Sequence, residues 1–319
     1  MACSPPTAPP RGEKGRSMIA EQLTLVGLGI QNVLIATDFS RCSNAALEVG
    51  LQLAKGYKAA VHIVFVVPSD EFLLAGPEAF VAAKEAARRD LDALNTELRR
   101  THPVDKAEAY HIYLLEGDVA QSLLDFAHQK QIDIIVLGTH GRGGLGRAML
   151  GSVAERVFRS SPIPVLTVGP GCCRPVQALA PANILVAADF SPASRRAAQY
   201  GATLARRHNS RLTLLHVLDP KQLEGIPDRA RVIREIEMKL AALVGPDAPS
   251  QHAQLVEAGR VVPTIRKVAA GLAADLLVIG VRSSAGVIER LLWPNAYAIV
   301  REAPCPVLTV RESMADAGS

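Results

Sequence analysis

The sequence lacks the features that mark several large classes of protein. Aromatic residues make up only 4% of its 319 residues, and the formal net charge at pH 7 is +4. So small a charge bias gives no reason to expect a nucleic-acid partner. No apolar run approaches the roughly 18 residues that span a bilayer, so we expect no membrane partner either. An apolar content of 49% excludes a chain that is disordered throughout.

Cysteine and histidine patterns argue against metal and disulfide chemistry. None of the five cysteines forms C-x-x-C, and none of the eight histidines forms H-x-x-x-H, so we expect no metal site. An odd number of cysteines in a chain of this length indicates a reducing cytosol. His62 and His216 fall in predicted strands as packed histidines, whereas His140 could either touch a bound phosphate or face solvent.

The chain repeats itself once. Three segments recur in the same order, 151 or 142 residues apart: VLIATDFS (33–40) as ILVAADFS (184–191), DIIVLG (133–138) as DLLVIG (275–280), and PIPVLTV (162–168) as PCPVLTV (304–310). A period of this size indicates two copies of one domain rather than a solenoid.

These repeats set the expected domain boundaries. The copies occupy residues 31–170 and 182–312, separated by a linker at 171–181. Residues 1–30 are expected to form a disordered tail, because their first part is rich in Pro, Gly and charge.

Strand and helix patterns alternate in each copy. Short apolar runs predict strands, and apolar residues at helical spacing predict helices. The strands expected in the first copy are 33–36, 61–67, 109–115, 134–137 and 165–168. Four helices are expected between them. The first begins near Ser43, which would cap it, the second begins at Pro77, and the others cover 119–131 and 152–159. We therefore predict an α/β protein of two tandem doubly wound domains, each a five-stranded, mainly parallel sheet with helices on both faces.

A glycine pattern follows the fourth predicted strand. Gly138, Gly141, Gly151 and Ser152 form G-x2-G-x9-G-S, with Ser152 opening or capping a helix. Glycines let the backbone approach a phosphate, and the free N–H groups of a helix amino terminus attract it. Arg142 and Arg147 add positive charge to this loop.

A carboxylate is expected at the other end of the same site. Asp38 follows the first strand, and ligands of doubly wound sheets lie beyond the strand carboxyl ends where the strand order reverses. If strands one and four are neighbours, Asp38 and Gly138 meet there, and the carboxylate can accept hydrogen bonds from a nucleoside. The alternative is a purely structural turn in which Asp38 or Ser40 caps the first helix.

Three competing motifs fail on context. The literal G-x-G-x-x-G at 141–146 follows the fourth strand instead of the first. A P-loop would need Lys and Ser or Thr where Arg147 and Ala148 stand. The nucleophile elbow G-x-S-x-G is absent.

The motifs VLIATDFS, DIIVLGTHGRGGLGRAMLGSVAERV and SPIPVLTV resemble those of the universal stress protein (UspA) family, in its tandem two-domain form, over about 270 of the 319 residues. The resemblance implies an adenine nucleotide alpha hydrolase-like fold. It also implies ATP held by Asp38, Gly138, Gly141, Gly151 and Ser152, with Arg142 nearby. Adenine would meet the backbone of Val66, and Ala36, Leu137 and Val153 would line the pocket.

The second copy departs from this pattern. It keeps Asp189 and Gly280, but Ser283 replaces the second glycine, and Trp293 and Pro294 replace Gly151 and Ser152. A Trp ring blocks the approach of a phosphate, and proline has no N–H to donate. We expect this copy to act as a built-in dimer partner, its final strand 307–310 pairing with 165–168, as the resemblance implies.

The expected function is that of an ATP-binding stress-response factor in which ATP orders the 142–150 loop for an unidentified protein partner. Mg²⁺ would accompany the phosphates, although no carboxylate pair is evident to hold it. We assign no catalytic residue; TDFSRCS (37–43) has neither the S-G-G-x-D-S nor the H-x-G-H motif of related enzymes. A slow ATP hydrolase and a nucleotide-independent interaction module stay open, as does pairing of whole chains into a homodimer.

Overall fold

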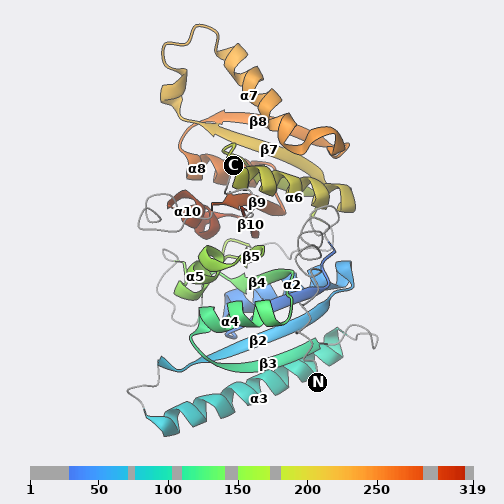
Figure 1. The fold of residues 1–319 in the computed structure, drawn as a ribbon, viewed down its shortest axis with the longest axis vertical. Helices are drawn as coiled ribbons and strands as arrows, with labels where there is room; N and C mark the ends of the chain where they lie inside the picture. Colours follow the sequence, from blue (N-terminus) through green and yellow to red (C-terminus); the bar gives the residue numbers. More distant parts are fainter. Residues whose placement is uncertain are drawn as a thin grey trace, which may run out of the picture.

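The computed structural model of the protein describes residues 29–70, 76–102, 110–140, 150–172, 181–282 and 294–312. Strands and helices alternate along the chain (Figure 1). The first half contains β1 (Asn32–Ala36), α2 (Arg41–Tyr57), β2 (Ala60–Pro68), α3 (Pro77–Thr101), β3 (Tyr110–Gly117), α4 (Val119–Gln129), β4 (Ile134–Gly138), α5 (Ser152–Ser160) and β5 (Val165–Val168). The second half contains β6 (Asn183–Ala187), α6 (Pro192–His208), β7 (Arg211–Leu218), α7 (Arg229–Val244), β8 (His252–Ala258), α8 (Val261–Gly271), β9 (Leu276–Val281), α10 (Pro294–Glu302) and β10 (Val307–Arg311), with the short 3₁₀ helices η2 (Pro220–Leu223) and η3 (Gly245–Asp247).

The strands form one ten-stranded sheet in the order β3-β2-β1-β4-β5-β10-β9-β6-β7-β8. Within each half all the pairs are parallel, as predicted, because helices connect successive strands. The two halves join through β5 and β10, which pair antiparallel. The two expected five-stranded sheets are therefore continuous, and the two final strands cover each other's edges.

This seam is held by a symmetric pair of side-chain hydrogen bonds. Leu166 pairs with Leu308 at its centre. On either side, Thr167 Oγ1 donates to the carbonyl oxygen of Val307 and Thr309 Oγ1 donates to that of Val165, both at 3.1 Å. Both threonines are buried, so each hydroxyl finds its partner across the seam.

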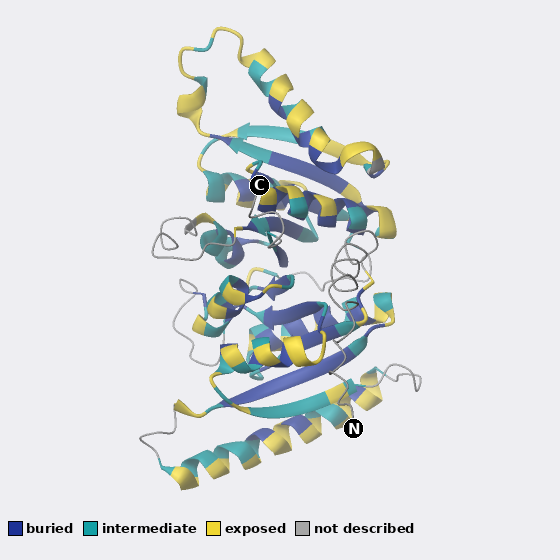
Figure 2. Ribbon diagram, viewed as in Figure 1, coloured by how far each residue is buried: buried dark blue, intermediate teal, exposed yellow. Residues whose placement is uncertain are grey.

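Helices cover both faces of the sheet, and the buried residues lie between the layers (Figure 2). One core cluster lies under α2, α6 and α7, and another lies under α4, α5, α8 and α10. Each of these clusters contains residues of both halves. A smaller cluster packs α3 against β2 through Leu91 and Phe65.

The aspartate of the repeated DIIVLG and DLLVIG segments has a structural role. Asp133 Oδ2 accepts hydrogen bonds from the N–H groups of Gln31 and Asn32, at 2.7 and 2.8 Å. Asp275 repeats this in the second half with Ala182 and Asn183, at 2.9 Å each. In each half the carboxylate binds the start of the first strand to the start of the fourth.

Two local predictions need correction. Ser43 does not cap the first helix: Ser40 is the N-cap of α2, and its Oγ accepts from Ser43 N–H at 3.2 Å. The sequence patterns also missed α10, a nine-residue helix that begins at Pro294.

The halves also meet away from the seam, where α2 and α6 both pack into one core cluster. The guanidinium of Arg207 lies 4.1 Å from the ring centroid of Tyr57, and His208 lies edge-on to the same ring. Arg207 is exposed, so this contact lies at the solvated surface of the junction.

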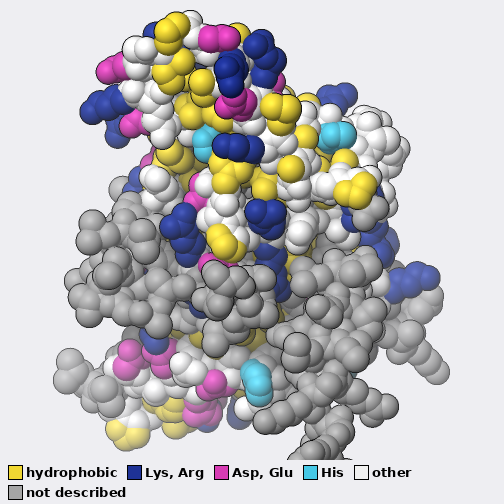
Figure 3. Space-filling view, turned by 45° about the horizontal axis from the view of Figure 1, so that its top comes forward, with side chains coloured by type: hydrophobic (Ala, Val, Ile, Leu, Met, Phe, Trp, Pro, Cys, Tyr) yellow, Lys and Arg dark blue, Asp and Glu magenta, His cyan; other side chains and the backbone are white. Residues whose placement is uncertain are grey.

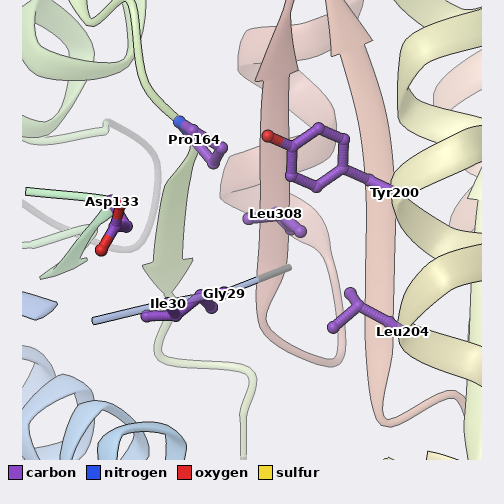
Figure 4. Close-up of a pocket in the computed structure, with 7 residues that line it drawn as sticks. All are labelled: Gly29, Ile30, Asp133, Pro164, Tyr200, Leu204 and Leu308. Carbon is purple, nitrogen blue, oxygen red and sulfur yellow. The ribbon is translucent and has the colours of Figure 1, made fainter. Parts of the chain in front are cut away.

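Figure 4 shows a small cavity at the same junction, where Tyr200 and Leu204 project from α6 toward Leu308, opposite Ile30 and Pro164. Its volume of about 30 Å³ suits a water molecule and excludes a nucleotide.

Candidate functional site

The candidate site lies at the carboxyl ends of β1 and β4. These strands are parallel neighbours, with Val33 paired to Ile134 and Ile35 to Val136. From β1 the chain builds the sheet outward in one direction through β2 and β3, and from β4 it builds in the other direction through β5. The strand order therefore reverses between β1 and β4, which is where ligands of open α/β sheets bind.

The turn from β1 to α2 positions Asp38. Asp38 Oδ1 accepts from Ser40 N–H at 3.0 Å, and Thr37 Oγ1 accepts from Phe39 N–H at 3.1 Å. Phe39 has φ of +60°, a left-handed conformation that is unfavourable for a non-glycine residue. Its ring stacks on Phe65 at 5.4 Å, and this contact offsets part of that cost.

Two hydrogen bonds connect this turn to the end of β4 and the start of α5. Ser40 Oγ donates to the carbonyl oxygen of His140 at 3.0 Å. Gly151 N–H donates to the carbonyl oxygen of Thr139 at 2.7 Å. The residues after β1, after β4 and before α5 therefore form one connected unit, as the spacing of Asp38, Gly138 and Gly151 predicted.

Two roles were predicted for Ser152 at the start of α5: opening the helix is confirmed, and capping it is not. Gly151 is the N-cap residue, without a side-chain capping bond, and Ser152 is the first helical residue instead of the cap. Because Gly151 N–H is bound to Thr139, the amides that can face an anion are those of the first helical turn, beginning with the exposed Ser152.

Gly138 has a packing role of its own. A Cβ at this position would lie 2.7 Å from the carbonyl carbon of Cys42 and from the nitrogen of Ser43. The first turn of α2 therefore requires glycine here whether or not a ligand binds. A Cβ at Gly280 would likewise overlap the backbone of Ala193 and Ser194 in α6, which explains why the second half keeps this glycine after losing the rest of the motif.

The four predicted pocket residues lie on one face of the sheet. Val66 and Leu137 belong to the core cluster under α4 and α5, and the partly buried Ala36 and Val153 pack against it. Strand β1 pairs with β2 only as far as Ala36 and Val64, and Thr37 N–H donates to the carbonyl oxygen of Val64. Val66 is two residues further along β2, so its N–H and C=O point the same way as those of Val64, into the space beyond the end of β1.

Several predicted residues lie outside the described residues. These are Gly141, Arg142 and Arg147 of the loop in the first half, and Ser283 and Trp293 of the second.

His140 and Cys42 flank the turn. His140 Nδ1 lies 2.9 Å from Thr139 Oγ1, and its Nε2 is enclosed with no hydrogen-bond partner among the described residues. Burial lowers the pKa of His140, which favours the neutral ring. Burial raises the pKa of the Cys42 thiol, which argues against a reactive thiolate beside Asp38.

Asp189 is the equivalent of Asp38 in the second half, and both of its carboxylate oxygens have partners within the chain. Asp189 Oδ1 accepts from the N–H and the hydroxyl of Ser191, and Arg282 Nη2 lies 3.3 Å from Asp189 Oδ2. Arg282 stands where the first half has His140, 142 residues earlier. Burial alone would raise the pKa of Asp189, but the Ser191 hydrogen bonds and the Arg282 charge outweigh it, so the pKa is lowered.

Other kinds of site have little support in the described part of the chain. It contains no group of three or more His, Cys, Asp and Glu side chains able to hold a metal ion. No helix within it is long and apolar enough to cross a membrane. Figure 3 shows Lys and Arg side chains scattered among acidic and other side chains on the face in view.

Comparison with known proteins identifies the family. The model of the universal stress protein family matches residues 29–169 and 182–311. A universal stress protein of Methanocaldococcus jannaschii is 32% identical over 139 residues, which is 43% of this chain and 81% of that protein. One of Mycobacterium tuberculosis is 26% identical over 308 residues, covering 88% of this chain and 94% of the relative.

Solved structures agree on the fold. The crystal structure of a universal stress protein from Archaeoglobus fulgidus superposes with a TM-score of 0.67 at 20% identity, over 89% of this chain and 97% of that one. The two segments that match the family model make up most of the sequence, so the chain belongs to the universal stress protein family.

Proposed function

We propose that the first half of this universal stress protein binds ATP and that the second half does not. The observation that carries the proposal is the connected unit of Asp38, Ser40, His140, Thr139 and Gly151. It holds a carboxylate and a helix amino terminus at the same edge of the sheet, where the strand order reverses. An acceptor for a nucleoside and amide donors for phosphates are the two groups that a nucleotide needs.

The apolar residues complete the proposed site. Ala36, Leu137 and Val153 supply a hydrophobic surface for the base, and the backbone of Val66 supplies hydrogen-bonding groups for its edge. The triphosphate would accept from the first amides of α5, with Gly141, Arg142 and Ser152 contributing. Mg²⁺ would be held mainly by the phosphates, because the described residues form no metal-binding cluster.

We propose a regulatory role in the stress response for the bound nucleotide, exerted in a reducing cytosol through conformation. Near Asp38 the hydroxyl of Thr139 lies 2.9 Å from His140 Nδ1, but Thr139 is fully buried, so we assign it no role as a nucleophile. Turnover at or above about 1 s⁻¹, the low end of ordinary enzymes, would instead favour the hydrolase alternative.

A second candidate function follows from the packing of Gly138 and the capping by Ser40. Both features serve α2 without any ligand, and Gly280 and Ser191 repeat them in the second half. A nucleotide-independent interaction module would need them equally.

Mass spectrometry of the purified protein for bound nucleotide, followed by calorimetry with ATP, separates the two functions. We expect one ATP per chain. Asp38→Ala should weaken binding at least about tenfold by removing a charged hydrogen-bond acceptor. Gly151→Val should abolish binding by placing a branched side chain where the phosphate approaches.

Asp189→Ala is the matched control and should leave ATP affinity unchanged. Absence of binding by the wild type would favour the interaction module. Two nucleotides per chain would contradict the assignment of the second half.

A further inference from the structure

The second half contacts the candidate site directly. Tyr297 of α10 accepts a hydrogen bond at its hydroxyl from Leu150 N–H, at 3.1 Å. The two residues are 147 positions apart in the chain, and α5 and α10 lie on the same side of the sheet, on either side of the β5–β10 seam (Figure 1). Leu150 is the residue immediately before the N-cap of α5.

The bond to Tyr297 fixes the amide of Leu150, and the next amide, that of Gly151, is fixed by another hydrogen bond. Leu150 N–H is bound to Tyr297, and Gly151 N–H is bound to Thr139 of the first half. Leu150 is only 4% exposed, so its amide needs an acceptor within the protein, and among the described residues Tyr297 supplies it. Two consecutive anchored amides set the direction of those that follow, which belong to the first turn of α5.

Tyr297 is not a repeat of a feature in the first half. The aligned residue 142 positions earlier is Glu155, whose carboxylate lies 3.4 Å from Arg159 on its own helix. The contact therefore runs from the half that has lost the glycine motif to the half that retains it.

We propose that Tyr297 is a positioning residue for the phosphate end of the nucleotide site, so that the second half regulates ATP affinity in the first. This inference rests on the proposed ATP binding. It gives the second half a role beyond covering the edge of β5. Tyr297 acts through the Leu150 backbone and does not touch the nucleotide.

The test uses the full-length chain with Tyr297→Phe, which keeps the ring and removes the hydroxyl. We expect the ATP dissociation constant to rise about fivefold, the equivalent of one net hydrogen bond. The affinity for adenosine should stay the same, because adenosine lacks the phosphates that α5 would hold. Hydrogen exchange at the Leu150 amide should accelerate in the nucleotide-free protein.

Tyr57→Phe is the matched control. Tyr57 also packs between the halves, but its hydroxyl has no hydrogen-bond partner in the part of the chain that the structure describes, so its removal should change neither affinity. If the wild type binds ATP and the Tyr297→Phe variant binds it with equal affinity, the positioning role is overturned. Equal losses for ATP and adenosine also overturn it, because they indicate a general structural defect. A wild type that binds no ATP overturns the proposed function itself and this inference with it.

Discussion

Arg282 forms an ion pair with Asp189, the second-half counterpart of Asp38, at 3.3 Å. The first half has His140 at the position of Arg282, and there the backbone carbonyl, not the side chain, bonds to the β1–α2 turn. The same fold therefore presents a carboxylate paired with arginine in one half and a carboxylate without an arginine at that position in the other. The presence or absence of this arginine is a second difference between the halves, separate from the replacement of Gly151 and Ser152 by Trp293 and Pro294.

Removing this arginine should not create a second nucleotide site. Arg282→His copies the first half, yet Pro294 still lacks the amide that α5 has at Ser152. We expect calorimetry to give the same number of ATP molecules per chain as the wild type. The free energy of unfolding should change by less than about 1 kcal/mol, since the pair is largely exposed. A stoichiometry that doubles would show that Arg282 alone silences the second half.

Adding a methyl group at Gly138 or Gly280 should destabilise the fold. Each Cβ would collide with the backbone of the helix that follows the first strand of its half. We expect Gly138→Ala and Gly280→Ala each to lower the free energy of unfolding by about 2 kcal/mol or more, measured by urea denaturation without nucleotide. Gly271→Ala is the control, because nothing lies within 4 Å of its Cβ. If Gly138→Ala left stability intact and only impaired ATP binding, the packing explanation would fail.

The stability of the fold should depend on the titration of His62. Its side chain is 7% exposed and lies between Asn32, Tyr113 and the ring of His111. Burial, aided by the charges of His111 and Lys130, lowers the pKa of His62 from 6.5 to about 4. Between these pH values His62 binds a proton in the unfolded chain but not in the folded chain. The free energy of unfolding therefore decreases as the pH falls from about 6.5 to about 4.

This loss should amount to about 3 kcal/mol. His62→Thr, which introduces the residue at the aligned buried position 213, should flatten the dependence of unfolding free energy on pH within that window. His128→Gln, at an exposed position of α4, serves as the control. Identical slopes for the wild type and His62→Thr would assign the acid sensitivity to other groups.

Much of the fold could be predicted from residues that act locally. The apolar run Val33–Ala36 and its repeat are buried strands because helices cover both faces of the sheet. SRCS offers two serines, and both Ser43 and Ser40 were considered as caps; the structure selects Ser40, whose Oγ accepts from Ser43 N–H. Helix α10 was missed, although its length of nine residues equals that of α5, which was predicted.

The candidate site was predicted in part. Asp38, Gly138 and Gly151 were identified from their spacing, and the structure joins the segments that carry them. The packing role of Gly138 and the contact of Tyr297 with Leu150 were not predictable, since each depends on a residue that no local pattern marks.

The sequence alone determined the strand and helix periods, because these depend on neighbours within a few residues. The repeat and the positions of the glycines and Asp38 can also be read directly from it. The pairing of β5 with β10 was expected from the family resemblance and is confirmed. Tertiary structure decided which carboxylate meets an arginine and which amide meets Tyr297. These outcomes depend on contacts between residues about 90 to 150 positions apart. Tyr297 meets Leu150, and Thr167 meets Val307, only because the two halves pack against each other.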